Sequence, residues 1–301
     1  GLPFSGPCPL TRDPFSEIRG HEAPVSSLSR SIREDRVASA LLFHGPSGVG
    51  KLTTALALCR GLLCEDAPAG TCGRCDSCRR VSAAALMHPD VGLLWPQPLK
   101  RKAGGKAGEE GDDGEREPED RPAGPLDPHS LQEEVRQDSR LRILAGPTRR
   151  RLSELFLSPG GGRRRILLIL SAERLGDVSG NILLKVLEEP PGRAIIILLC
   201  ESPSALLPTL RSRCQPYRFS PLPRSVVEDF LRARGAVSAD GARLIASLAG
   251  GRIGSALLLA RGADAYLARR ETLSRLLGDV RREKSAAACL AWPGTGSHPP
   301  R

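Results

Sequence analysis

The chain has 301 residues, of which 40% are hydrophobic, enough to form apolar cores in more than one domain. Its net charge of +10 permits a polyanionic partner. The aromatic content of 3% argues against a single-stranded nucleic-acid platform that works by base stacking.

Two features favour a cytoplasmic protein with no membrane partner. The N-terminal stretch "GLPFSGPCPLTRDPF" lacks the basic-then-apolar order of a secretion signal, and no apolar run approaches the roughly 18 residues that span a bilayer. The nine cysteines, four of them clustered, suit metal binding in a reducing compartment better than a disulfide framework.

The first elements form the context of a phosphate-binding loop. "APVSSLSRSIRE" predicts a helix, and the short apolar strand "ALLF" follows it. A glycine-rich loop within "FHGPSGVGKLT" then leads into the helix "LTTALALCRGLLC". Strand, glycine loop and helix in this order are what the motif G-x-x-x-x-G-K-[ST] requires.

The loop matches this motif except at its last position. Leu52 stands where a Ser or Thr hydroxyl normally binds Mg²⁺, and Thr53 comes one residue late, about 100° further around the helix. The backbone N–H groups and the lysine can still hold a phosphate. The candidate phosphate-binding residues are Gly45, Gly48, Gly50, Lys51 and Thr53.

A cysteine cluster follows the second predicted helix. Its spacing is C-x₇-C-x₂-C-x₂-C, formed by Cys64, Cys72, Cys75 and Cys78. Four thiolates so close in sequence can form a tetrahedral zinc site with no open position for catalysis. The alternative is four unrelated thiols. We therefore expect a structural zinc site, and we expect Cys59, on the preceding helix, to be a core residue.

The rest of the chain alternates between helices and apolar strands, apart from one charged segment. Residues 97–130 are rich in charge, Gly and Pro, which predicts a disordered surface insertion or, alternatively, a docking segment. The remaining expected elements are strands at 91–95, 165–170 and 194–200, helices within 147–159 and 178–191, and short helices over 224–277. This order predicts a doubly wound parallel sheet followed by a small helical domain.

The strand at 165–170 lacks the acidic residues of a working ATPase. Such an enzyme needs a carboxylate at the end of this strand to hold Mg²⁺, and Leu170 and Ser171 occupy those positions. Glu173 comes two residues later, where we expect it to lie past the strand and face elsewhere. Hydrolysis at this chain's own site is therefore not expected.

Arg213, in "LPTLRSRCQPYRF", allows two interpretations. It follows a predicted helix and stands between small residues, where its guanidinium can project from the surface. It is either a solvated arginine or an arginine finger that reaches a phosphate on a neighbouring subunit.

Together these motifs resemble a known family. "HGPSGVGK", the four cysteines, "HPD", "NILLKVLEEPP" and "LRSRC" resemble the AAA+ subunits of the bacterial DNA polymerase III clamp loader, over about residues 15–260 apart from the insertion. The sequence departs from the motor subunit's pattern at Leu52, Leu170–Ser171, Cys200 and Gly254, all positions that the resemblance connects with ATP hydrolysis. Arg213 is retained. This combination is similar to the delta-prime type of subunit.

The resemblance implies a domain organisation. An N-terminal extension (1–14) precedes a P-loop AAA+ domain (15–219) that carries the zinc module (about 64–78) and the insertion. A helical lid (220–265) follows, and the last segment (266–301) is a truncated or atypical end in which the family's collar domain is largely absent.

The resemblance also implies a function. A delta-prime-like subunit does not hydrolyse ATP, although its loop holds ATP or ADP or stays empty. Its Arg213, positioned by Ser212 and Cys214, completes the ATP site of an adjacent gamma/tau subunit. These subunits and delta form a hetero-pentameric ring within the DNA polymerase III holoenzyme, which opens the sliding clamp and places it on primed DNA.

Two alternatives stay open. The first is an ATP-hydrolysing gamma/tau-like motor that uses Thr53 and Glu173 in shifted roles. The second is a zinc-stabilised nucleic-acid-binding module that acts through its basic charge.

Overall fold

The computed structural model describes residues 12–67, 70–81, 86–98, 127–160, 163–235 and 237–261. The chain divides into two compact units between Leu222 and Pro223. Three predicted segments lie largely or wholly outside the described residues: the N-terminal extension, the charged insertion and the segment that follows the lid.

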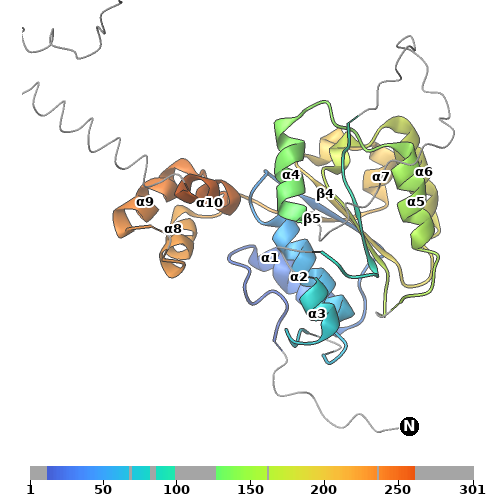
Figure 1. Cartoon of the computed structure of the whole chain (residues 1–301), viewed down its shortest axis with the longest axis horizontal. Coiled ribbons are helices and arrows are strands. Elements are labelled where there is room, and N and C mark those ends of the chain that lie inside the picture. The colour runs from blue at the N-terminus through green and yellow to red at the C-terminus, as the bar shows by residue number, and fades with distance from the viewer. Residues whose placement is uncertain are drawn as a thin grey trace, which may run out of the picture. The chain divides into compact units, whose positions relative to one another are not determined.

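A five-stranded parallel sheet forms the centre of the first unit (Figure 1). Its strand order is β2-β3-β4-β1-β5, so β1 lies between the two strands that come last in the sequence. Each neighbouring pair is parallel, which requires a crossover connection between the strands. The strands are β1 (Ala40–His44), β2 (Val91–Leu94), β3 (Ile166–Ile169), β4 (Ile195–Cys200) and β5 (Gln215–Arg218).

Helices cover both faces of this sheet. The described helices of the unit are α1 (Glu22–Arg33), α2 (Lys51–Leu63), α3 (Asp76–Arg80), α4 (Pro128–Gln137), α5 (Ala145–Glu154), α6 (Asp177–Glu188) and α7 (Pro208–Ser212), with short 3₁₀ turns η1 (Ala172–Arg174) and η2 (Pro203–Ala205). Helices α1 and α2 pack on one face, and α5, α6 and α7 pack on the other.

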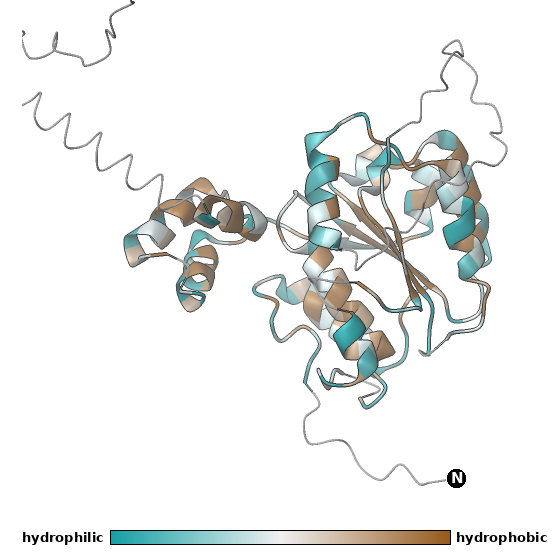
Figure 2. Ribbon diagram, viewed as in Figure 1, coloured by the Kyte–Doolittle hydropathy of each residue, from teal (hydrophilic) through white to brown (hydrophobic). Residues whose placement is uncertain are grey.

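Alternating side chains of each strand supply the two cores. In β1, Leu41 and Phe43 point into the core shared with α1 and α2, whereas Ala40 and Leu42 point into the core shared with α5 and α6. Strands buried on both faces are continuous apolar runs, and Figure 2 shows them largely in brown, whereas the surrounding helices mix teal, white and brown. The predicted α/β class with a parallel P-loop sheet is confirmed.

Strand β5 and helices α3 and α4 of the first unit were not predicted. Strand β5, "QPYR", exposes most of its residues at the edge of the sheet, so it lacks the apolar run that identifies the other strands. Helix α4 begins inside the range predicted to be a disordered insertion. For residues 128–130 that prediction is wrong, because they form the first turn of the helix. Asp127 caps this helix by accepting from the His129 N–H at 2.9 Å, and Pro128 occupies its first turn.

The described part of the second unit is helical, as predicted. It contains α8 (Arg224–Ala233), α9 (Ala239–Leu248) and α10 (Ile253–Arg261). The Ser238 hydroxyl caps α9 by accepting from the Gly241 N–H at 3.2 Å. Val227, Leu231 and Ile245 are buried within this unit. Among the described residues of the whole chain, no helix is both long enough and apolar enough to cross a membrane.

Candidate functional site: a phosphate loop, a cysteine cluster and an exposed arginine

The glycine loop lies between β1 and α2, at the carboxyl edge of the sheet. Gly45, Gly48 and Gly50 have φ angles of 144°, 77° and 115°, a region that favours glycine. Gly45 also approaches the chain that follows β5: a Cβ atom added there would lie 1.9 Å from the Phe219 carbonyl oxygen. The sequence thus folds locally as a phosphate loop.

The side chains at the start of α2 point in three different directions. Lys51 is buried, and its ammonium donates to the carbonyls of Gly45 and Pro46, the latter at 2.9 Å. Leu52 is only 2% exposed and belongs to the apolar core. Thr53 is exposed, and it is not among the side chains that line the pocket beside Lys51. No hydroxyl from these two positions reaches that pocket.

The pocket beside Lys51 is small. Its volume is about 10 Å³, close to the space of one water molecule. Besides Lys51, its lining comes from the loop, the ends of β3 and β4, and α4: Ser47, Gln132, Arg136, Ser171, Glu173, Leu199, Cys200 and Glu201. The site therefore has the backbone of a phosphate site but little room in this conformation.

The orientation predicted for Glu173 is wrong. Ser171 adopts a left-handed backbone conformation (φ 50°), and the 3₁₀ turn η1 then brings the Glu173 side chain back into the pocket. One of its oxygens, Oε2, is buried and has no hydrogen-bond partner among the described residues. Leu170, by contrast, is fully buried in the apolar core.

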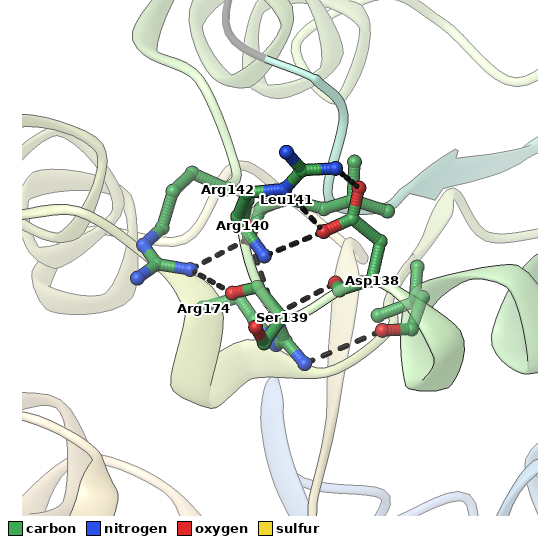
Figure 3. A network of polar contacts seen from close by, with 7 residues as sticks. Asp138, Ser139, Arg140, Leu141, Arg142 and Arg174 are labelled. Carbon is green, nitrogen blue, oxygen red and sulfur yellow. Dashed lines mark hydrogen bonds and ion pairs between the residues drawn. The ribbon is translucent and has the colours of Figure 1, made fainter.

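Helix α4 covers the pocket because its end is anchored to the same turn. The Arg174 guanidinium donates to three backbone carbonyls at and after the end of α4: Val135 at 3.3 Å, Asp138 at 3.1 Å and Leu141 at 3.5 Å. Figure 3 shows this network, in which Asp138 also pairs with Arg140. A guanidinium satisfies free carbonyls at a helix end well. These bonds place Gln132 and Arg136 of α4 against the phosphate loop.

Burial opposes the charges of two side chains in the pocket, Lys51 and Glu173. It lowers the pKa of Lys51, and the neighbouring Glu201 carboxylate only partly counteracts this effect. It also raises the pKa of Glu173, and repulsion from Glu201 adds to this rise, while Lys51 opposes it. Two carboxylates and the Arg136 guanidinium thus stand beside a lysine whose donors already face its own loop.

The four clustered cysteines converge. The sulfur atoms of Cys64, Cys72, Cys75 and Cys78 all lie within 4.8 Å of one another. Two of the pairs, Cys64–Cys75 and Cys72–Cys78, are 4.0 Å apart. A tetrahedral ion with metal–sulfur bonds of about 2.3 Å needs sulfurs roughly 3.8 Å apart. The cluster can therefore hold a metal ion.

Backbone geometry supports the cluster. Gly73 has φ of 70°, and the backbone N–H groups of Cys72, Cys75 and Cys78 donate to cysteine sulfurs at 3.3–3.4 Å. Such N–H groups stabilise thiolate charge, which favours a bound cation. Cys59, a residue of α2, is fully buried in the core, as the sequence predicted.

The "HPD" motif links the cysteine cluster to the sheet. The Ser77 hydroxyl, between two of the clustered cysteines, donates to Glu65 at 2.6 Å and lies 2.9 Å from the His88 ring nitrogen Nε2. His88 Nδ1 accepts from the Asp90 N–H at 3.1 Å, and the Asp90 carboxylate accepts from the Gly160 N–H at 2.7 Å. Ser77, His88 and Asp90 are all buried, so this chain fixes the module against the start of β2.

Arg213 lies directly after α7 with its side chain 37% exposed. Its guanidinium donates to the Glu188 carboxylate at 2.8 Å and to the Thr209 carbonyl at 3.1 Å. Of its two neighbours, Ser212 is exposed and donates to the Thr209 carbonyl at 3.0 Å, whereas Cys214 is buried in the core shared with α6. The structure does not bring Arg213 into the pocket of Lys51.

Four residues near these sites were missed by sequence reasoning: Gln132, Arg136, Glu188 and Glu201. The Asp127–Pro128 pair at the start of α4 is a sequence signal for that helix, but the position of the helix over the loop depends on tertiary contacts. Glu188 lies within the quoted "LEEPP", where nothing in the sequence separates it from Glu189.

A family model described as "DNA polymerase III, delta subunit" matches residues 20–223. The delta-prime subunit of Bacillus subtilis is 30% identical over 222 residues, 73% of this chain and 54% of that protein. The delta-prime subunit of Escherichia coli is 30% identical over 252 residues, 83% and 62% of the two chains. The gamma/tau subunit of Mycobacterium tuberculosis is also 30% identical, over 79% of this chain and 34% of that protein. The chain thus spans less than two thirds of the length of these relatives.

Solved structures agree on the fold. A RuvB variant from Thermotoga maritima superposes with a TM-score of 0.52 over 87% of this chain and 67% of that protein, at 14% sequence identity. This likeness concerns the fold alone. On the strength of the family model and the relatives, the chain belongs to the delta-prime and gamma/tau family of DNA polymerase III, the AAA+ subunits of the bacterial clamp loader.

Proposed function

We propose that this chain is a delta-prime-like clamp-loader subunit that does not hydrolyse ATP itself and supplies Arg213 to the ATP site of an adjacent gamma/tau subunit. The observation that carries the proposal is that leucines occupy two motif positions whose side-chain oxygens normally bind Mg²⁺. Leu52 and Leu170 are both packed in the apolar core, so neither position offers a ligand to Mg²⁺.

The small pocket supports the first half of this proposal. A nucleotide needs space for its phosphates next to the lysine, and here that space is about 10 Å³ with the Glu173 and Glu201 carboxylates on its walls. Gln132 and Arg136 of α4 also line this space, so α4 narrows the room left for a nucleotide. The chain's own loop thus serves as a structural element that holds β1 and α2 together.

The exposed arginine supports the second half. A finger must lie outside its own chain's phosphate site and remain accessible to a partner, and Arg213 meets both conditions. An arginine supplied in trans stabilises charge in the transition state of phosphoryl transfer and is worth roughly 10³–10⁵ in rate. The proposed partners are gamma/tau and delta in a five-subunit ring, with the sliding clamp and primed DNA, in the cytoplasm.

For the cysteine cluster we propose structural zinc. Four thiolates are the donor set typical of closed zinc sites, and the cluster offers no open position at which a substrate would bind. Zinc would join the end of α2 to α3 and so hold the module in one conformation. Its chemistry there would be structural only.

The test measures ATP turnover by gamma/tau in the presence of delta, clamp and primed DNA. The additions are buffer, this chain, its Arg213→Ala variant and its Arg211→Ala variant, which removes the neighbouring exposed arginine of α7. We expect the parent and Arg211→Ala to raise turnover and Arg213→Ala to assemble without raising it. If Arg213→Ala assembles and is as effective as the parent, the finger role is refuted.

One observation favours a second function, that of a gamma/tau-like motor. Glu173 lines the same pocket as Lys51, as a shifted catalytic carboxylate would. In that case the isolated chain turns over ATP, and Glu173→Gln abolishes the turnover. A silent isolated chain removes this alternative.

A further inference from the structure

The Arg213 guanidinium is held by two acceptors that come from different elements. The Glu188 carboxylate, at the end of α6, accepts from Nη2 at 2.8 Å, and the Thr209 carbonyl, within α7, accepts from Nη1 at 3.1 Å. A guanidinium has five N–H donors in a fixed plane. Two of them are used among the described residues, so three N–H groups are left for a further acceptor.

The two elements that supply these acceptors are packed closely together. A Cβ atom added at Gly180 of α6 would lie 2.8 Å from the Leu207 side chain, which immediately precedes α7. Leu210 of α7 is buried in the same core as Leu183 of α6. The end of α6 is therefore held relative to α7, which places the Glu188 carboxylate within 2.8 Å of the arginine.

The ion pair between Arg213 and Glu188 is weak enough to leave the arginine able to bind a phosphate. The Arg213 and Glu188 side chains are 37% and 53% exposed, and exposed pairs attract only weakly because water screens them. Such a pair restricts the rotamers of a long side chain without neutralising its attraction to a group of higher charge. A phosphate can then engage the remaining donors while Glu188 stays bound.

We propose that Glu188 is a positioning residue: it holds the Arg213 guanidinium in place before a phosphate of the neighbouring subunit's nucleotide arrives. This inference rests on the proposed finger role of Arg213. Ordering the side chain in advance lowers the entropy lost in the transition state, so the effect belongs in kcat more than in KM.

The experiment is a double-mutant cycle in the assembled complex of gamma/tau, delta, clamp and primed DNA. Glu188→Gln keeps an oxygen acceptor but loses the charge, and Glu188→Ala loses both. We expect kcat to fall by about 2-fold for Gln and about 5-fold for Ala, with KM for ATP unchanged, the range that an exposed charged pair supports. Glu189→Gln, which changes the adjacent exposed carboxylate, is the matched control.

The cycle separates positioning from a merely structural effect. In an Arg213→Ala background, Glu188→Ala should cause no further loss, because the side chain it positions is gone. An additive loss, an unchanged kcat or a raised kcat in the single variant would overturn the positioning role. If Arg213→Ala itself is fully active, the finger role fails first and the positioning role fails with it.

Discussion

At Gly45 the phosphate loop has no space for a side chain and adopts a backbone conformation that favours glycine. Its φ is 144°, and an added Cβ would lie 1.9 Å from the Phe219 carbonyl oxygen, so the loop touches the chain that leaves β5. We expect Gly45→Ala to lower the free energy of unfolding by about 2 kcal/mol or more. Urea unfolding followed by circular dichroism measures this loss.

The control for this substitution is Gly146→Ala in α5. Nothing lies within 4 Å of a Cβ added at Gly146, and alanine favours the first turn of α5, so this variant should gain on the order of a few tenths of a kcal/mol. Equal effects of the two substitutions would contradict the close approach at Gly45.

Glu173 should make stability depend on pH. Because burial raises its pKa above the ordinary 4.5, the folded state binds this proton more tightly than the unfolded state. Its stabilising contribution is complete below pH 4.5 and is lost as the pH rises through the folded-state pKa. Glu173→Gln removes this titration. Its free energy of unfolding, relative to the parent, should therefore increase from pH 4.5 toward neutral pH, measured by urea unfolding at several pH values. A difference that stays constant with pH would refute the explanation.

At the scale of elements, the cysteine module depends on a metal ion in our proposal. Metal analysis of reduced protein should find one zinc per chain. Cys75→Ser should lose it, together with on the order of 4 kcal/mol or more of stability, because three thiolates hold zinc poorly. Cys59→Ala removes a buried thiol outside the cluster and should keep the metal. Metal-free parent protein with unchanged stability would contradict the zinc assignment.

The elements that could be predicted are those with a strong local signal. Four strands of the sheet are apolar on both faces, and such runs identify buried parallel strands without any tertiary information. Strand β5 could not be found in this way, since only Tyr217 of its residues is buried and its pairing with β1 supplies the missing information. Helix α4 was hidden by the charged segment before it, although its Asp-Pro start is a recognisable cap.

Some features of the candidate site could likewise be predicted from the sequence, and others depend on tertiary contacts. The positions of Lys51, Leu52 and the four cysteines follow from spacing on a known motif, and the structure places them as that spacing implies. The inward turn of Glu173 depends on the left-handed backbone at Ser171, which hydrophobic periodicity does not reveal. The cover formed by α4 depends on Arg174 binding carbonyls more than thirty residues earlier in the chain.

For the molecule as a whole, the candidate sites and the match to the family model lie almost entirely in the first of the two units. The first contains the loop, the cysteine cluster and Arg213, and the family model ends almost where this unit ends, at residue 223. The described part of the second unit contains helices only and supplies none of the candidate site residues. Family membership therefore rests mainly on the first unit.

The order of the strands also determines when the sheet can form during synthesis of the chain. Strand β1 is synthesised first, yet both of its partners, β4 and β5, come after residue 194. The nascent chain must therefore carry this largely apolar strand without a partner until β4 has left the ribosome, and with one edge unpaired until Arg218 has left it. Pairings so distant in sequence form slowly and leave apolar surface exposed meanwhile. The first unit can thus complete its sheet only after β5 has been synthesised, and a chaperone that covers the exposed apolar strands would protect it until then.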